Sequence, residues 1–203
     1  MKILDTLSVT EKNVDTSDLV RIYLCGVTVY DESHIGHART IIVFDTLRRY
    51  LESKGVIVNL VQNFTDIDDK IINRAGKENT SAEEISSRYI TDYFQDFDRL
   101  NVKRADSYPK ATEHITDMIN LIQGLIDKGF AYISKNGVYF SVLKFKEYGK
   151  LSKKKIDELI AGYRVDVDER KRSPLDFALW KKAKEGEVFW ESPWGNGRPG
   201  WHI

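Results

Sequence analysis

The stretch VRIYLCGVTVYDESHIGHARTIIVFDTLRRYLESKGVIVNLVQNFT, residues 20–65, decides the fold of this 203-residue chain. Its first residues, Val20 to Leu24, have the β-branched and aromatic content of a buried strand. A helical pattern starts near His34 to His37 and runs to Gly55, a natural helix end. Val56 to Val61 forms a second apolar strand of the kind found in parallel sheets. The stretch therefore predicts a strand–helix–strand unit.

Parallel strands joined by a helix need a right-handed crossover, so both strands end at one edge of the sheet. Open α/β sheets bind ligands at that edge. We expect the short loop Val27 to Ser33 to lie there, with Cys25, Gly26, His34 and Thr65 close together.

Helical signals follow this unit. A helix is predicted from Asp66 to about Gly76, and Ser81 with Glu84 three residues on is a capping-box signal for a helix that ends near Leu100. Pro109 precedes a further helical pattern, which Lys128 and Gly129 close. The apolar positions of that pattern are Ile115, Met118, Ile119, Leu121, Ile122, Leu125 and Ile126.

The pattern then changes to short strands. Phe130 to Ile133 and Val138 to Val142 are separated by a polar turn at Ser134 to Gly137, which predicts an antiparallel hairpin. Asp176 to Lys182 regains apolar and aromatic character. Ser192 to Gly200 (SPWGNGRPG) is a Gly/Pro loop too specific in composition for a generic linker.

The chain has 31 basic and 31 acidic residues, so net charge gives no support to a nucleic-acid partner, and any basic footprint must be local. The charged stretch Lys144 to Arg172, with its lysine run Lys153 to Lys155, is interpreted first as a solvated surface and second as a nucleic-acid-facing patch. No apolar run is long enough to cross a bilayer, and the N-terminus lacks a signal peptide pattern. We expect a cytoplasmic protein.

Cys25 is the single cysteine, which excludes an internal disulfide. A buried small hydrophobe, a reactive thiol and one ligand of a metal site stay open for it, and composition favours the first. Asp66, Asp68 and Asp69 invite a magnesium interpretation, but their position at a helix start favours complementation of the helix dipole.

His34, Ile35, Gly36 and His37 spell HIGH at the predicted helix start. In isolation, two such histidines are expected to cap the helix locally. Their position favours more, because a helix N-terminus presents free N–H groups and a positive dipole end that suit polyphosphate. Gly36 would let a nucleotide approach the backbone, and imidazoles can donate hydrogen bonds to phosphate oxygens as charge develops.

Four segments resemble, in order and spacing, the cysteinyl-tRNA synthetase family: residues 25–40 (CGVTVYDESHIGHART), 63–75 (NFTDIDDKIINRA), 171–181 (KRSPLDFALWK) and 192–203 (SPWGNGRPGWHI). The resemblance implies a class I synthetase catalytic fold of the α/β class, a Rossmann-like parallel sheet interrupted by a connective-peptide insertion that holds the antiparallel hairpin. The implied division is residues 1–115 for the first part of the catalytic domain, 116–175 for the insertion and 176–203 for the return.

The resemblance also implies site residues and substrates. His34 and His37 match residues that bind ATP and stabilise the adenylation transition state, and Cys25 matches one zinc ligand. The ATP-facing region is Val27, Thr28, His34, Ile35, Gly36 and His37, and positions matching the cysteinyl-adenylate pocket are Cys25, Gly26, Val27, Thr28, Thr40, Asn63, Thr65 and Trp201. Alternatives stay open: Thr65 as a helix N-cap and Trp201 as a core aromatic.

The implied reaction activates L-cysteine with ATP and Mg²⁺ and transfers cysteine to tRNA(Cys). Zn²⁺ suits the selection of cysteine, because an apolar pocket separates cysteine poorly from serine whereas zinc with an open position binds the substrate sulfur. The family continues beyond the position of Ile203 with a second cysteine ligand, then a histidine and a glutamate. One cysteine cannot complete such a site, so we expect the chain alone to be a fragment, metal-free or weakly loaded, with little activity.

Two alternatives remain. The first is a mycothiol-type cysteine ligase, which resembles the same fold and transfers cysteine to an amino sugar, although Lys171 and Arg172 follow the synthetase pattern instead. The second is a non-catalytic module that binds a nucleotide or a protein partner.

Overall fold

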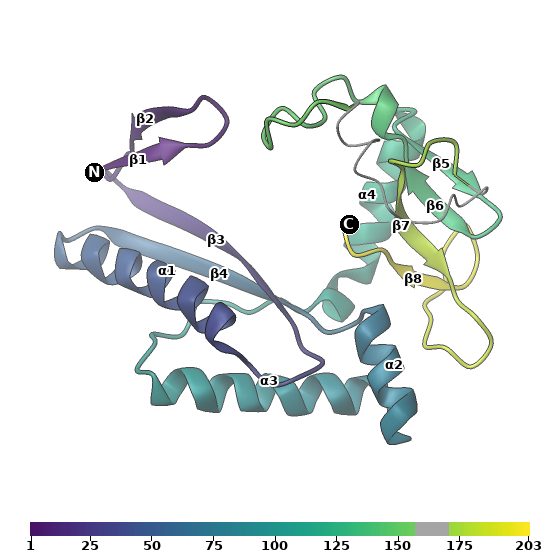
Figure 1. Ribbon diagram of the computed structural model, residues 1–203, viewed down its shortest axis with the longest axis horizontal. Coiled ribbons are helices and arrows are strands. Elements are labelled where there is room, and N and C mark those ends of the chain that lie inside the picture. The colour runs from purple at the N-terminus through teal and green to yellow at the C-terminus, as the bar shows by residue number, and fades with distance from the viewer. Residues whose placement is uncertain (157–170) are drawn as a thin grey trace. The chain divides into compact units, whose positions relative to one another are not determined.

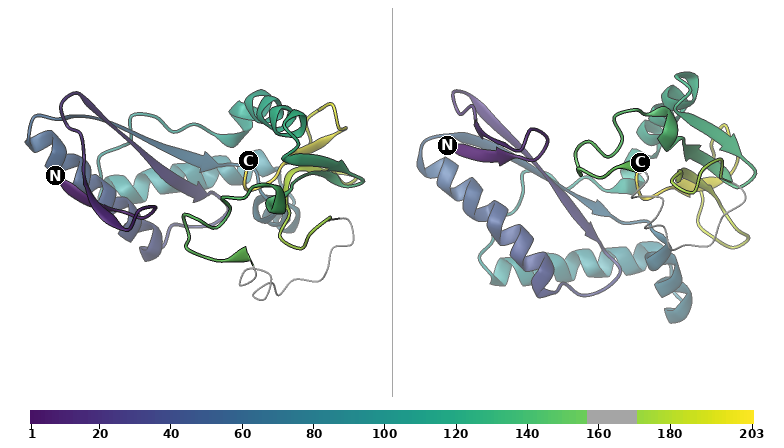
Figure 2. Two further views of the ribbon diagram at one scale, coloured as in Figure 1. Left: turned by 90° about the horizontal axis from the view of Figure 1, so that it is seen from above. Right: turned by 45° about the horizontal axis from the view of Figure 1, so that its top comes forward.

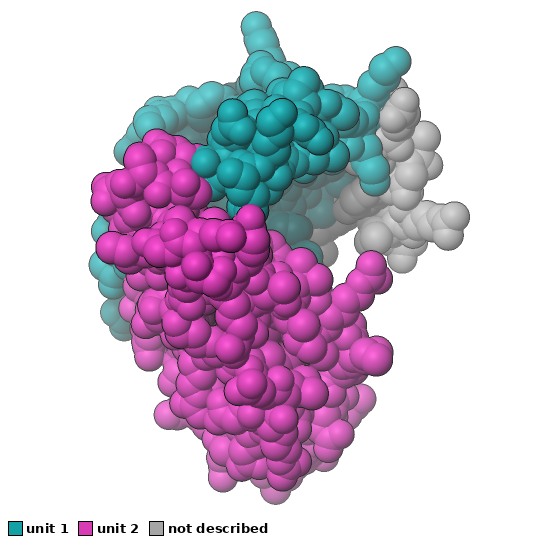
Figure 3. Space-filling model, turned by 90° about the vertical axis from the view of Figure 1, so that its left-hand side faces the viewer, with its two compact units in different colours: residues 1–14, 115–203 teal, residues 15–114 magenta. Residues whose placement is uncertain are grey.

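A computed structural model describes residues 1–156 and 171–203 of the chain, which has a mixed α/β structure (Figure 1). The chain forms two compact units (Figure 3), one of residues 15–114 and one that combines residues 1–14 with residues 115–203.

The unit of residues 15–114 contains the predicted strand–helix–strand arrangement. Strand β3 (Leu19–Thr28) is followed by helix α1 (Ile35–Ser53) and strand β4 (Ile57–Thr65). β3 and β4 pair in parallel from Leu19 opposite Ile57 to Thr28 opposite Thr65, and α1 runs beside them (Figure 1). The expected Rossmann-like βαβ unit is confirmed.

β3 is longer than the sequence indicated. The predicted strand ended at Leu24 with a loop from Val27, but the strand continues to Thr28 because the pairing shifts register between Leu24 and Val27. Such a bulge absorbs extra residues without ending a strand. The expectation of a loop over Val27 and Thr28 was therefore wrong.

A further segment without strand assignment pairs with the other edge of β4. Val61 bridges Ser107 and Phe64 bridges Lys110, both in parallel. The amide of Phe64 donates to the Pro109 carbonyl at 2.9 Å. β4 is thus hydrogen-bonded on both edges, which makes it the central strand of this unit.

Two more helices complete the unit. α2 spans Asp69–Glu78 and α3 spans Ala82–Arg99. Ser81 caps α3 as predicted, with its hydroxyl accepting from the Glu84 amide at 3.0 Å. α2 starts later than the predicted Asp66, because Asp68 is its N-cap and the Asp66 carboxylate accepts hydrogen bonds from Thr112.

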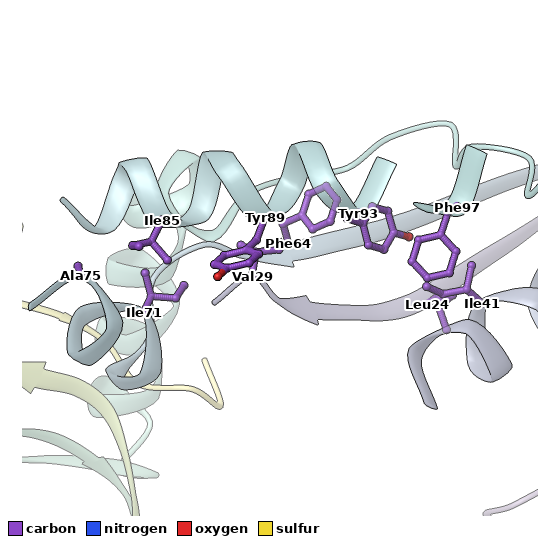
Figure 4. Close-up of a cluster of buried hydrophobic side chains, with 10 residues drawn as sticks. All are labelled: Leu24, Val29, Ile41, Phe64, Ile71, Ala75, Ile85, Tyr89, Tyr93 and Phe97. Atoms are coloured by element: carbon purple, nitrogen blue, oxygen red, sulfur yellow. The ribbon is translucent and has the colours of Figure 1, made fainter. Parts of the chain in front are cut away.

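The core of this unit joins both strands to all three helices. Phe64 of β4 stacks on Tyr108 at 5.3 Å between ring centroids and meets Tyr93 of α3 edge-on at 5.1 Å. The buried cluster is drawn in Figure 4 and consists of Leu24, Val29, Ile41, Phe64, Ile71, Ala75, Ile85, Tyr89, Tyr93 and Phe97. The same apolar contacts therefore fix α1, α2 and α3 against the β3–β4 pair.

A buried arginine fastens α1 to the segment that pairs with β4. Arg48, only 3% exposed, donates to both carboxylate oxygens of Asp106 at 2.8 and 3.0 Å and to the Arg104 carbonyl at 2.8 Å. The same Asp106 carboxylate accepts from the Leu60 amide of β4 at 2.7 Å. One ion pair thus holds three segments in register.

The other unit is antiparallel. Its N-terminal part is a hairpin of β1 (Lys2–Asp5) and β2 (Thr10–Asn13), for which no strand was predicted. A 3-10 turn, Ala111–His114, precedes its helix α4 (Ile115–Asp127), which ends before Gly129 at φ 76° as predicted.

A four-stranded sheet follows α4 in the order β5-β6-β7-β8, with the strands labelled in Figure 1 and seen from two further sides in Figure 2. The strands are β5 (Ala131–Ser134), β6 (Gly137–Phe140), β7 (Phe177–Lys182) and β8 (Gly197–Pro199). A short 3-10 turn, Val142–Lys144, comes after β6. The hairpin predicted at residues 134–137 is confirmed.

β7 pairs with β6 of that hairpin, although the predicted division separated residues 176–203 from residues 116–175. The domain division stays a prediction. Beside the sheet, the buried Asp176 carboxylate accepts from Tyr132 and from the Val142 amide at 2.8 and 3.0 Å. Burial raises the pKa of Tyr132 to about 12, so its hydroxyl stays a donor.

No helix within the described ranges is long and apolar enough to span a membrane. The predicted surface at Lys144 to Arg172 lies partly outside the described residues, which stop at residue 156 and resume at residue 171.

Candidate active site

Two histidines begin α1 with a reciprocal pair of hydrogen bonds. His34 is the N-cap, and its Nδ1 accepts from the Gly36 amide at 3.1 Å. His37 Nδ1 accepts from the His34 amide at 3.3 Å, and the two rings stack with centroids 3.8 Å apart. This is the capping-box arrangement with imidazoles in both positions. The local capping expected of such histidines is present.

The caps determine which ring nitrogens remain as donors. A nitrogen that accepts a hydrogen bond carries no proton, so in the neutral form of each ring the proton sits on Nε2. Burial, with a smaller contribution from the neighbouring His34, lowers the pKa of His37 below its ordinary value. The neutral form of His37, with one Nε2–H donor, therefore dominates at neutral pH.

Besides ligand access, a steric contact explains why position 36 is a glycine. A Cβ at this position would lie 2.9 Å from Cε1 and 3.0 Å from Nδ1 of His34. The glycine thus leaves room for the imidazole that folds back over the first turn of α1.

The histidines line a cavity of about 330 Å³ at the carboxyl end of β3. The lining residues are Gly26, Val27, Thr28, Tyr30, Asp31, Glu32, His34, His37 and Lys70. Five of these are predicted site residues. Their gathering at the end of a parallel strand and the start of a helix agrees with the expected position of a ligand site.

Asn63 joins the two strands beside the bulge. Its Oδ1 accepts from the Gly26 amide at 2.8 Å and from the Tyr23 hydroxyl at 2.9 Å. An added Cβ on Gly26 would lie 1.4 Å from the Asn63 carbonyl oxygen, so only glycine fits there. The predicted pair Gly26 and Asn63 is therefore in direct contact.

Three further predicted residues do not line this cavity. Thr40 lies in α1, where its hydroxyl donates to the Gly36 carbonyl at 3.3 Å, and Ile35 is 88% exposed at the helix start. Thr65 ends β4, and its carbonyl accepts from the Val29 amide at 3.3 Å. The alternative of Thr65 as a helix N-cap is wrong, because Asp68 caps α2.

Cys25 lies in β3 and is exposed, so the composition-based expectation of a buried cysteine is wrong. A structural zinc site needs four ligands and a catalytic one needs three from the protein. Among residues 1–156 and 171–203, no three His, Cys, Asp or Glu side chains are grouped so that they could hold a metal ion. The described residues therefore do not form a zinc site by themselves.

Trp201 belongs to the other compact unit and is 65% exposed, with its ring 4.8 Å from that of His202. This exposure excludes the alternative of a core aromatic. The core tryptophan of that unit is Trp180, which is 1% exposed.

Four lining residues were not predicted as site residues: Tyr30, Asp31, Glu32 and Lys70. The first three lie shortly before the HIGH sequence, separated from it by Ser33, so proximity along the chain was a usable signal. Lys70 comes from the first turn of α2, and its Nζ lies 4.9 Å from the centroid of the Tyr30 ring. Only the tertiary structure brings it to the cavity.

Comparison with known proteins places this cavity in a family context. A family model described as tRNA synthetases class I (C) catalytic domain matches residues 11–203. The chain belongs to this family. The cavity at the end of β3 thus lies in a class I (C) synthetase catalytic domain.

Relatives within this synthetase family are close in sequence. The cysteine–tRNA ligase of Thermodesulfovibrio yellowstonii is 60% identical over 209 residues, which cover 100% of this chain and 43% of that protein. The cysteine–tRNA ligase of Aquifex aeolicus is 59% identical over 184 residues, covering 91% of this chain and 37% of that protein. The chain thus spans less than half the length of the relatives it matches.

Solved structures support the class I synthetase fold. The Mycobacterium tuberculosis methionyl-tRNA synthetase in complex with methionyl-adenylate matches with a TM-score of 0.54 and 17% identity, over 62% of this chain and 25% of that chain. The LeuRS of a ternary complex with tRNA and LeuAMS from Agrobacterium radiobacter K84 matches with a TM-score of 0.51 and 19% identity, over 62% and 16% of the two chains. The expected fold class is confirmed.

Proposed function

We propose that this chain is part of a cysteine–tRNA ligase, which activates L-cysteine with ATP to cysteinyl-adenylate and transfers cysteine to tRNA(Cys). The observation that carries the proposal is the cavity lined by the mutually capped His34 and His37. The names of relatives about 60% identical over the whole chain support the choice of cysteine.

In the activation step the cysteine carboxylate attacks the α-phosphorus of ATP and pyrophosphate leaves, so negative charge develops on phosphate oxygens. The Nε2–H groups of His34 and His37 are the donors we assign to those oxygens, because their Nδ1 atoms are engaged in the caps. The N-terminus of α1 adds its positive dipole end. Mg²⁺ would accompany ATP as part of the substrate.

Zinc remains a proposal for the whole protein, with Cys25 as the candidate ligand from this chain. Its exposed position on β3, beside the cavity-lining Gly26, leaves the thiol accessible to a metal or a substrate. X-ray absorption of the full-length protein would test this: a zinc–sulfur signal that changes on adding cysteine supports it, and an unchanged signal contradicts it.

The full-length protein is the right material for the functional test. Wild type should catalyse cysteine-dependent ATP–pyrophosphate exchange and charge tRNA(Cys). His34→Asn keeps a good N-cap residue but loses the Nε2 donor, so exchange should fall about 100-fold or more with little change in helix content. His114→Asn, in the short turn before α4, is the control. Absence of cysteine-dependent exchange in the wild type would refute the proposal.

The two alternatives are not favoured. Relatives 58–60% identical over the whole chain are named cysteine–tRNA ligases, not mycothiol-type ligases or non-catalytic modules. A transfer assay distinguishes the proposed function from the mycothiol-type ligase. The full-length enzyme, supplied with cysteine and ATP, should transfer cysteine to tRNA(Cys) and not to the amino-sugar acceptor glucosaminyl-inositol. For such an enzyme we propose a cytoplasmic location and no membrane partner.

A further inference from the structure

We propose that Lys70 binds the polyphosphate of the nucleotide in the cavity that His34 and His37 line. The inference rests on the proposed function and adds a phosphate-binding residue from α2 to the site. Lys70 is in the first turn of α2, where its amide donates to the N-cap carboxylate of Asp68 at 2.9 Å.

The Lys70 side chain is held at the cavity by an aromatic ring. Its Nζ lies 4.9 Å from the centroid of the Tyr30 ring, and both residues line the cavity. A cation over an aromatic face is attracted by the negative potential of the ring, which biases a flexible side chain toward one position. Tyr30 therefore positions the ammonium before any ligand arrives.

The Lys70 ammonium forms no ion pair with a carboxylate of the described residues. Across residues 1–156 and 171–203, no carboxylate is paired with it, whereas Asp31 pairs with Arg74 at 3.5 Å. Its three N–H donors thus remain free for a ligand, and phosphate oxygens are strong acceptors for an ammonium group.

Charge on the cavity wall explains why an ammonium is needed there. Asp31 and Glu32 contribute two carboxylates to the lining, and the capped His37 is neutral near pH 7 because its pKa is lowered. Lys70 is the one ammonium among the lining residues. The two carboxylates outnumber the single ammonium, so Lys70 reduces the negative charge of the lining, and its loss would strengthen the repulsion of a polyphosphate.

The chain offers a matched control. Lys54, the C-cap residue of α1, lies 5.7 Å from the centroid of the Tyr50 ring and does not line the cavity. Lys54→Met removes a lysine from a tyrosine face, as Lys70→Met does, but leaves the cavity unchanged.

The test uses the full-length protein and cysteine-dependent ATP–pyrophosphate exchange. Lys70→Met should raise the KM for ATP about tenfold or more, the loss expected for one charge-assisted hydrogen bond, while Lys54→Met stays within twofold of wild type. Lys70→Arg should recover most of the loss. The effect should shrink as salt is raised, because partly exposed charges are screened.

Adenosine separates phosphate binding from a merely structural role. As a competitive inhibitor it lacks phosphate, so its inhibition constant should be the same for wild type and Lys70→Met. An equal loss for adenosine and ATP, or an unchanged KM for ATP, would overturn the assignment. Inactivity of the wild type itself would instead refute the proposed function.

Discussion

The imidazoles of His34 and His37 stack 3.8 Å apart, and each accepts a backbone hydrogen bond at the start of α1. The pair therefore caps the helix and at the same time commits both Nδ1 atoms. Protonation of His37 Nδ1 would break its cap on the His34 amide, so this part of the capping arrangement depends on the titration of His37.

This dependence predicts a loss of stability in mild acid. The pKa of His37 is lowered in the folded protein, so between that value and the ordinary value of about 6.5 the unfolded chain binds more protons. Its contribution to stability is therefore complete above pH 6.5 and declines as the pH falls toward the folded pKa. Urea unfolding of the full-length protein from pH 8 to pH 5 should show this decline.

A glutamine at position 37 is the control for that titration. His37→Gln can still accept at the third helical position, as in a capping box, but does not titrate. The variant should lose the part of the decline between pH 6.5 and pH 5 that His37 causes. An identical slope in both proteins would assign the decline to other groups.

Gly36→Ala should weaken the first turn of α1. The new methyl group would lie 2.9 Å from Cε1 of His34, so the ring must rotate away and its cap is lost, a change of about 1 kcal/mol in the free energy of unfolding. The better helix propensity of alanine offsets part of this. Gly76→Ala in α2, where nothing lies within 4 Å of the added Cβ, should instead stabilise by about 0.5–1 kcal/mol.

Equal stabilisation by the two alanines would show that His34 does not fill the space above Gly36. The midpoints of urea unfolding, at unchanged m-values, compare the free energies of unfolding of the two variants. ATP–pyrophosphate exchange should fall for Gly36→Ala alone.

Asn63→Leu should loosen the end of β3. The Gly26 amide and the Tyr23 hydroxyl, which now donate to Asn63 Oδ1, would lose their acceptor, at about 1 kcal/mol or more for the partly buried amide. Asn63→Asp keeps an acceptor oxygen and should cost less. Thermal melts rank the three proteins, and a leucine variant as stable as the aspartate variant would contradict the role.

Asp106→Ala should be the most destabilising of these changes, by about 3 kcal/mol, because the buried Arg48 guanidinium loses its two-oxygen carboxylate partner and keeps only Glu52 at 3.0 Å. Arg104→Ala removes a surface partner of Asp98 and should cost less than about 1 kcal/mol. Urea unfolding compares the two. Similar losses in the free energy of unfolding for the two variants would mean that water solvates the Arg48 guanidinium once the Asp106 carboxylate is removed.

The sequence predicted the βαβ unit because apolar runs, a helix start and a glycine stop agreed with one another. It failed where tertiary contacts decide. The bulge beyond Leu24 extends β3 past Gly26, and no local pattern signals which residues oppose Asn63. The segment that pairs with β4 near Pro109 was missed because it has no apolar alternation of its own.

The candidate site shows the same contrast between residues that local sequence predicts and residues that only tertiary contacts bring in. His34, Gly36 and His37 could be predicted because one helix start carries them. Val27 and Thr28 were assigned through the family resemblance alone, since the strand was expected to end at Leu24. Lys70 could not be predicted, since α2 brings it from a separate stretch. The exposure of Cys25 and Trp201 was also beyond composition, because burial depends on neighbours that the chain supplies from elsewhere.

The division into two units bears on synthesis. Residues 15–114 are one continuous stretch with its own aromatic core, whereas the other unit needs both residues 1–14 and residues 115–203. During synthesis, residues 15–114 are therefore all present before residues 115–203, with which residues 1–14 form the other unit, have been made. Helix α1 can thus pack into its core during synthesis, before residues 115–203 are available to complete the unit that contains the N-terminal hairpin.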